Sequence, residues 1–319
     1  MGSLTGPSIQ GSRISGWMLL FSPGLVLPLP PRLSSWVQRL VVLPADSTAS
    51  RHPGAAASGM RGAGRRRALV PLLSLLVLSA CAIPAAKAPF PVQTLADAGL
   101  KPLAADTLAA CARALALPPE LARPADPSNF GQRQARDDFG RAVPNRPQLI
   151  VLHETVISAA DTARLFATPH PRDEDQASYH LLIDRLGQRL RIVPDDSRAY
   201  GTGMAAFGDF TVRIRPSSVG SLNNVALHLS LESPVDGRGD GDAHSGYSAQ
   251  QYRVMAGQVL LWQAAYGIPI SRVTTHEAVD RSHSRRDPRS FRWQAFDGAW
   301  RAAAERCGLT AYDRGRATI

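Results

Sequence analysis

The sequence predicts an α/β fold, a single mixed β-sheet flanked by helices, with candidate metal ligands at one edge of the sheet. Residues 148–153 form a continuous apolar run, which is typical of a buried central strand. Residues 225–232 alternate between apolar and polar side chains, as a strand with two different faces does. Residues 248–265 fit a long helix, because Ser248 is a good N-cap and a Gly and a Pro follow. Strands and helices in this mixture indicate a sheet covered by helices.

The other regular elements are predicted in chain order within a domain at residues 147–309. Apolar runs, turn residues and helix caps separate them. They are a helix at 158–166, two strands at 179–184 and 188–193 joined by Arg185-Leu186-Gly187, a short strand or loop at 272–275, and a last helix at 293–307.

Residues 60–80 have the layout of a bacterial lipoprotein signal peptide. Three arginines, 65–67, precede an apolar stretch at 68–78 that is shorter than the roughly 20 residues needed to span a bilayer. Small residues then lead to a cysteine in Leu78-Ser79-Ala80-Cys81. We therefore expect lipidation of Cys81 and anchoring of the mature chain to a membrane.

The segments around this signal lack the periodicity of folded elements. We expect residues 1–59 to be either an upstream extension, with translation starting at Met60, or a disordered leader. Residues 81–93 resemble a tether. Residues 94–146 are predicted to be an N-terminal extension of helix and loop, and residues 310–319 a tail.

Most of the net positive charge of the chain lies in residues 1–80. Residues 1–80 contain 8 of the 36 basic and 1 of the 26 acidic residues, so residues 81–319 carry a net charge of only +3. No basic stripe with interleaved aromatic residues is present in the sequence. We therefore predict no nucleic-acid partner.

Two cysteines besides Cys81 leave two interpretations. In an exported protein Cys111 and Cys307 could form a disulfide between the extension and the last helix. Alternatively, both are unpaired and buried, because a free cysteine packs as a small hydrophobic side chain.

Three residues could together hold a metal ion: His153, His276 and Asp287. A zinc hydrolase needs three protein ligands of these types and an open position for the water that it acidifies. The sequence has no His-Glu-x-x-His pattern, so the metalloprotease interpretation of His153-Glu154 or His276-Glu277 fails.

The segment from about 148 to 300 resembles the type-2 N-acetylmuramoyl-L-alanine amidases, which include peptidoglycan recognition proteins and phage lysozyme-type amidases. The matching pieces occur in the family's order. They are the strand 149–153, the segment 177–187 (family pattern S-x-H-Y-x-I-x-R-D-G), the segment 197–203 (R-A-W-H-A-G), Thr275-His276-Glu277, and Arg285-Arg286-Asp287-Pro288.

This resemblance implies a zinc enzyme with ligands His153, His276 and Asp287. It implies that the enzyme hydrolyses the amide between N-acetylmuramic acid and L-alanine, in peptidoglycan or its fragments. Glu232 aligns with the family's acidic residue and would transfer protons, and a shift of the alignment would put His228 in that role.

Arg285, together with Tyr179, would stabilise the oxyanion, although the family usually has Lys at the position of Arg285. Two further departures are Thr202 in place of a His and Arg289 in place of a Gly. They leave two alternatives open: a lipoprotein that binds peptidoglycan without cutting it, and a zinc amidohydrolase for another amide. With the lipid anchor, the expected location is the outer membrane, facing the periplasm and its peptidoglycan.

Overall fold

The computed structural model describes residue 95 and residues 100–216, 218–239 and 241–309. The predicted upstream extension, signal peptide, Cys81 anchor, tether and C-terminal tail lie outside the described residues. Among the described residues, no helix combines the length and the apolar character needed to cross a membrane.

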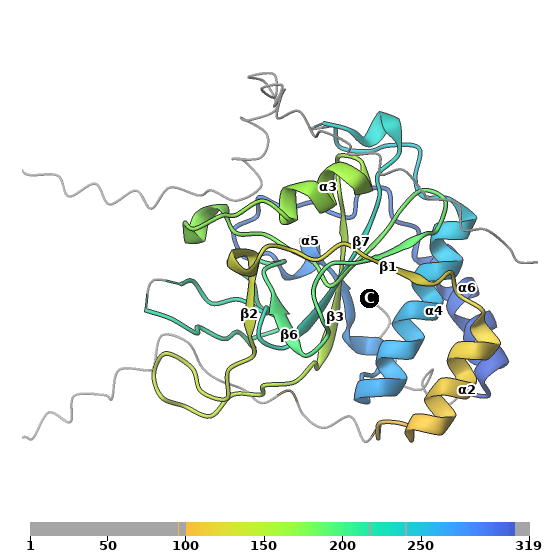
Figure 1. Ribbon diagram of the computed structural model, residues 1–319, viewed down its shortest axis with the longest axis horizontal. Coiled ribbons are helices and arrows are strands. Elements are labelled where there is room, and N and C mark those ends of the chain that lie inside the picture. The colour runs from red at the N-terminus through yellow and green to blue at the C-terminus, as the bar shows by residue number, and fades with distance from the viewer. Residues whose placement is uncertain (1–94, 96–99, 217, 240, 310–319) are drawn as a thin grey trace, which may run out of the picture. The chain divides into compact units, whose positions relative to one another are not determined.

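The fold is built on a six-stranded mixed sheet, with strand order β1-β5-β4-β7-β3-β8 (Figure 1). β7 pairs in parallel with β3 and β4, β3 pairs in parallel with β8, and β4 pairs antiparallel with β5. The predicted fold class is therefore confirmed. The strands are β1 (Glu120–Ala122), β3 (Leu149–Glu154), β4 (Leu181–Ile183), β5 (Arg189–Arg191), β7 (Ala226–Leu231) and β8 (Val273–Thr275).

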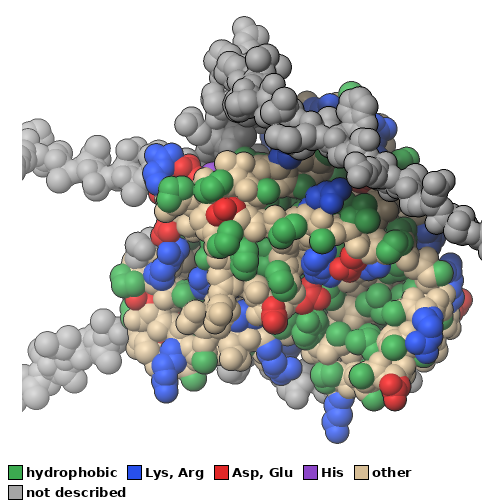
Figure 2. Space-filling view, viewed as in Figure 1, with side chains coloured by type: hydrophobic (Ala, Val, Ile, Leu, Met, Phe, Trp, Pro, Cys, Tyr) green, Lys and Arg blue, Asp and Glu red, His purple; other side chains and the backbone are tan. Residues whose placement is uncertain are grey.

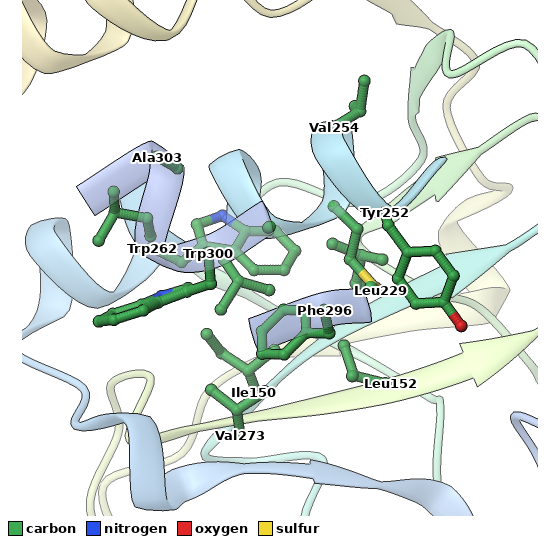
Figure 3. Packing of buried hydrophobic residues seen from close by; sticks show 14 of the residues in the cluster. Ile150, Leu152, Leu229, Tyr252, Val254, Trp262, Val273, Phe296, Trp300 and Ala303 are labelled. Atoms are coloured by element: carbon green, nitrogen blue, oxygen red, sulfur yellow. The ribbon is translucent and has the colours of Figure 1, made fainter. Parts of the chain in front are cut away.

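One face of the sheet packs against three helices, α2 (Ala105–Leu115), α4 (Ala249–Tyr266) and α6 (Trp293–Cys307), which lie together in Figure 1. Alternate strand residues point toward them, among them Ile150, Leu152 and Leu229. Figure 3 shows these side chains against aromatic residues of α4 and α6, including Phe296 and Trp300. This apolar layer is the main core of the domain.

The other face of the sheet is covered by α3 (Ala159–Phe166) and by irregular segments. Leu182 and Leu190 pack there against α3 residues, and Leu149 and Val151 pack against residues from 205–225. A second, two-stranded sheet of β2 (Phe130–Gln132) and β6 (Ser197–Ala199) completes the arrangement. All residues of β3 and β7 are buried, so both strands are central, as the apolar run predicted for β3.

The two predicted helix starts are confirmed by their caps. The Ser158 side chain accepts a hydrogen bond from the Asp161 amide at the start of α3. Ser248 and Gln251 form a reciprocal capping box at the start of α4, and Gly267 ends that helix in the left-handed conformation, which glycine adopts readily. The hairpin of β4 and β5 and the short strand β8 are also as predicted.

Several short elements were not anticipated, namely β2, β6, β1 and α5. The three exposed residues of β1 extend the main sheet by pairing in parallel with β5, although residues 116–123 have no strand-like alternation. A single helical turn, α5 (His276–Val279), follows β8 directly and is capped by the Thr275 side chain. Elements this short depend on their tertiary partners, which local patterns do not reveal.

The two cysteines of the domain form a disulfide. Cys111 of α2 and Cys307 of α6 are bonded, with a distance of 2.00 Å between their sulfur atoms. Of the two interpretations of these residues, the structure has the paired one. The N-terminal extension is thus covalently attached to the last helix of the domain.

The face of the molecule drawn in Figure 2 mixes charges of both signs. On the face seen in Figure 2, basic, acidic and hydrophobic side chains are interspersed, and the basic ones do not gather into a stripe.

Candidate metal centre

Three side chains from separate parts of the chain converge at one end of the parallel strands. In β3 and β8, Leu152 pairs with Thr275, so His153 and His276 follow side by side. Asp287 comes from the loop after α5, and its backbone carbonyl accepts a hydrogen bond from the Glu277 amide. The sheet register therefore sets the position of the two histidines, and the loop adds the carboxylate.

The distances within this group are short. His153 Nδ1 lies 3.2 Å from Asp287 Oδ2, and His276 Nδ1 lies 3.0 Å from Asp287 Oδ1. The three potential ligand atoms all lie within 4.8 Å of one another, and both histidines are buried. These are the residues that the sequence predicts as a metal site, and the structure brings all three together.

The ionisation of the group suits metal binding. Burial lowers the pKa of His153 to about 4, so the ring is neutral near pH 7. For Asp287 burial alone would raise the pKa, but the attraction of His276 and hydrogen bonds from His153 and His276 lower it well below its usual range. Neutral imidazole and ionised carboxylate are the forms that coordinate a metal ion.

The donor set is two nitrogens and one oxygen, which zinc binds with a fourth position left for water or substrate. Within the part of the chain that the structure describes, this is the group of His, Cys, Asp and Glu side chains that meets the geometry of a metal site. The residues therefore fit a catalytic zinc ion better than a structural one, which has four protein ligands.

Tyr179 and Arg285, which the sequence predicts as oxyanion-stabilising residues, lie near this group, and their catalytic role stays a prediction. The Tyr179 ring stacks on the His153 ring, with 4.5 Å between their centroids. Burial and the negative charge of Asp287 raise the pKa of Tyr179 well above its usual range. The positive charge of Arg285 acts on both His153 and Tyr179, where it favours the neutral imidazole and the ionised phenol.

Glu232 is placed differently from the other predicted residues. β3 and β7 pair so that Ser230, not Glu232, lies opposite His153. Glu232 comes after the end of β7, and its carboxylate accepts a hydrogen bond from the Arg185 amide in the β4–β5 turn, at 3.1 Å. In this structure the carboxylate thus contacts the hairpin instead of the three metal-site residues, and its catalytic role stays a prediction.

His228, the alternative to Glu232, does contact the site. Its Nδ1 lies 3.0 Å from Nε2 of His153, on the side of the ring away from Asp287. Gly201 leaves the space for the His228 ring, because a Cβ atom there would lie 2.5 Å from it. Burial lowers the pKa of His228 well below its usual value, and the histidine is neutral.

Several polar residues around the centre were not singled out by the sequence. Glu154, adjacent to His153, accepts hydrogen bonds from Arg289, Tyr247 and Ser233. The only sequence signal among them is Arg289, which stands where the amidase pattern has a glycine. Contacts of this kind join residues that are far apart in the chain, and no spacing rule reveals them.

A mixed sheet with two histidines at the ends of its parallel strands, joined by an aspartate from a nearby loop, defines an α/β domain with a candidate metal site. Residues 143–290 match the family model of the N-acetylmuramoyl-L-alanine amidases, Amidase_2. The domain that these residues form belongs to the type-2 N-acetylmuramoyl-L-alanine amidase family. No curated protein sequence matches the chain.

Solved amidase structures are similar to the chain at low sequence identity. The selenomethionine derivative of AmpD is 20% identical, with 58% of this chain and 94% of that chain covered and a TM-score of 0.42. AmpD from Citrobacter freundii is 18% identical, with coverage of 64% and 96% and a TM-score of 0.38. The amidase LysC from Clostridium intestinale is 16% identical, with coverage of 51% and 86% and a TM-score of 0.33.

Proposed function

We propose that this protein is a zinc-dependent hydrolase of the amide between N-acetylmuramic acid and L-alanine, in peptidoglycan or its soluble fragments. The observation that carries the proposal is the convergence of His153, His276 and Asp287 within a domain of the amidase family. Near pH 7 His153 is a neutral imidazole and Asp287 an ionised carboxylate, which are the forms that coordinate zinc.

A zinc ion at this position would supply Lewis-acid polarisation and a bound water whose pKa is about 7. The protein contributes the surrounding groups. The Tyr179 hydroxyl, with its raised pKa, stays protonated and can donate a hydrogen bond to the substrate carbonyl oxygen. Arg285 is a fixed cation near Tyr179, suited to stabilise the negative charge that develops on that oxygen.

The leaving amine must also receive a proton. Glu232 is the proposed donor, as the family resemblance implies, but its carboxylate would have to leave the Arg185 amide to reach the substrate. His228 is the alternative, because it is already 3.0 Å from His153. Comparing Glu232→Gln with His228→Gln separates them: the variant that loses turnover while it still binds zinc identifies the donor.

The test of the function itself is mass analysis of digested peptidoglycan. The purified protein should release peptides that begin with L-alanine, and a chelator should stop the release until zinc is added back. Release that continues in the chelator would refute zinc dependence. No release from either sacculi or soluble muropeptides would refute the hydrolase.

The position of Glu232 favours a second candidate, a peptidoglycan-binding protein without hydrolytic activity. Such a protein would sediment with sacculi and leave their amide bonds intact. Binding in the absence of any released peptide, with zinc present, would support this candidate over the amidase.

We further propose that the protein is a lipoprotein of the outer membrane, facing the periplasm. Support comes from the sequence Leu78-Ser79-Ala80-Cys81 and from the disulfide between Cys111 and Cys307, which forms in oxidising compartments such as the periplasm. A Cys81→Ser protein should move from the membrane fraction to the soluble periplasmic fraction. Unchanged fractionation would contradict the lipid anchor.

A further inference from the structure

A buried carboxylate lies directly behind the metal centre. Glu154 follows His153 in β3, and because consecutive strand residues point to opposite faces, it faces the α4 and α6 side of the sheet. Only 3% of Glu154 is exposed. Its carboxylate accepts hydrogen bonds from five groups, namely the Arg289 amide (3.2 Å), Arg289 Nε (2.5 Å), Ser233 Oγ (2.8 Å), His244 Nε2 (3.1 Å) and Tyr247 Oη (3.2 Å).

Arg289, the ion-pair partner of Glu154, is also buried, and each of its guanidinium nitrogens donates a hydrogen bond. Its exposed fraction is 7%, and its two terminal guanidinium nitrogens donate to the backbone carbonyls of Gly237, Gly239 and Gly241. The guanidinium therefore joins the carboxylate of Glu154 to the loop that follows β7. A buried charge pair with its hydrogen bonds satisfied in this way has a single favourable arrangement.

The two segments that meet here are the ones that carry the metal ligands. On one side of the sheet His153 contacts Asp287, and on the other side the next residue, Glu154, contacts Arg289, two residues beyond Asp287. The strand end and the loop are thus joined twice, once through candidate ligands and once through the buried ion pair. We propose that Glu154 and Arg289 are positioning residues that hold His153 and Asp287 at the separation that zinc requires.

The pair also connects the centre to residues 233–247. The amide of Gly246 donates to Nδ1 of His244, which leaves Nε2 of that ring to donate to Glu154. The Ser233 and Tyr247 hydroxyls, at the two ends of the same loop, also donate hydrogen bonds to the Glu154 carboxylate. Displacement of the Glu154 carboxylate would therefore disturb the loop and both ligand segments together. Outer groups that orient metal ligands commonly affect metal affinity by roughly 10- to 100-fold.

The inference rests on the proposed zinc site, and zinc affinity tests it apart from turnover. Glu154→Gln preserves the shape of the side chain and removes its charge, and Arg289→Lys preserves the charge and removes the paired donors. Both full-length variants should bind zinc roughly 10- to 100-fold more weakly than wild type in competition with a chelator. The metal-free melting temperature of each variant is measured alongside.

Asp137→Asn is the matched control. Asp137 is also a buried carboxylate paired with an arginine, Arg141, at 2.7 Å, but its hydrogen bonds stay within residues 137–141. This variant should lower the melting temperature and leave zinc affinity unchanged. Tyr247→Phe, which removes one of the five donors to Glu154, is the milder variant if Glu154→Gln does not fold, and should also weaken zinc binding.

Three results would overturn the inference. The first is wild-type zinc affinity in folded Glu154→Gln, Arg289→Lys or Tyr247→Phe protein. The second is an equal loss of affinity in Asp137→Asn, which would reduce the effect to general destabilisation. The third is a wild-type protein that does not bind zinc, which would overturn the proposed function as well, whereas the first two leave that function standing.

Discussion

The two faces of the central sheet differ sharply in chemistry. The face under α4 and α6 presents leucine and isoleucine side chains to a continuous apolar layer (Figure 3). The opposite face of the same strands buries the polar side chains of His153, His228 and Ser230. Ser230 Oγ and His228 Nε2 are buried there without a hydrogen-bond partner. The face under α4 and α6 thus contributes the main apolar core, with Glu154 as a polar exception at the end of β3. The opposite face has apolar contacts of its own and also buries polar groups, whose burial costs free energy and whose placement serves the candidate site.

The largest effect is expected from the loss of a candidate metal ligand on the polar face, the face of the sheet that carries His153, His228 and Ser230 (called the functional face below). Asp287→Asn keeps the size of the side chain and removes the negative charge between His153 and His276. Zinc affinity should fall by more than the roughly 10- to 100-fold expected for an outer group, and amide hydrolysis should fall with it. Chelator competition and muropeptide turnover measure the two effects. Wild-type turnover would remove Asp287 from the site.

A substitution in the apolar core under α4 and α6 should instead lower the stability of the fold. Trp300 is 1% exposed, packs in the main core, and donates a hydrogen bond from Nε1 to Gln263. Trp300→Ala should lower the free energy of unfolding by about 3–5 kcal/mol. Denaturant unfolding of the metal-free protein checks this value. The comparison of the two faces would fail if this variant changed zinc affinity in the folded state as strongly as Asp287→Asn does.

The buried histidines predict a pH dependence that belongs to the functional face. Burial lowers the pKa of His180 well below 6.5, and its Nδ1 accepts a hydrogen bond from the His228 amide, which requires the neutral ring. Because the unfolded chain binds this proton more readily, stability is fully present above about pH 6.5 and is lost as the pH falls below it. Unfolding of the metal-free protein between pH 7.5 and 5 should show this slope, and His180→Asn should reduce it. An unaltered slope would assign the pH dependence to other groups.

The smallest expected effect concerns Ser230. Its hydroxyl is buried opposite His153 without a hydrogen-bond partner, so Ser230→Ala removes an unsatisfied group. The free energy of unfolding should be unchanged or higher by up to about 1 kcal/mol. Denaturant unfolding at neutral pH measures it. A clear loss of stability would show that the hydroxyl has a partner on this face.

Much of the fold could be predicted because local patterns and tertiary demands agree. The apolar run at 148–153 became a central strand, and the Ser248 cap opened a helix whose buried side packs on that strand. β1 was missed because its three exposed residues carry no pattern, and only pairing with β5 makes them a strand.

The part of the site that could be predicted is the part that lies at the ends of the strands. His153 and His276 each come at the end of a parallel strand, which is where such sheets commonly place functional groups. The sequence could not show that register places Ser230 opposite His153 while the Glu232 carboxylate turns to the hairpin. It also could not show the pairing of Glu154 with Arg289, which are 135 positions apart.

The bond between Cys111 and Cys307 has a consequence for a chain that is cut. It closes a covalent ring over a separation of 196 residues that includes the sheet, the candidate ligands and the loops between them. A single protease cleavage anywhere inside that ring opens it without separating the two pieces. Nicked protein should therefore migrate as one species on a non-reducing gel and as two after reduction. In the proposed periplasmic location, where proteases are present, this linkage would keep both parts of the candidate metal centre on one molecule after a first cut.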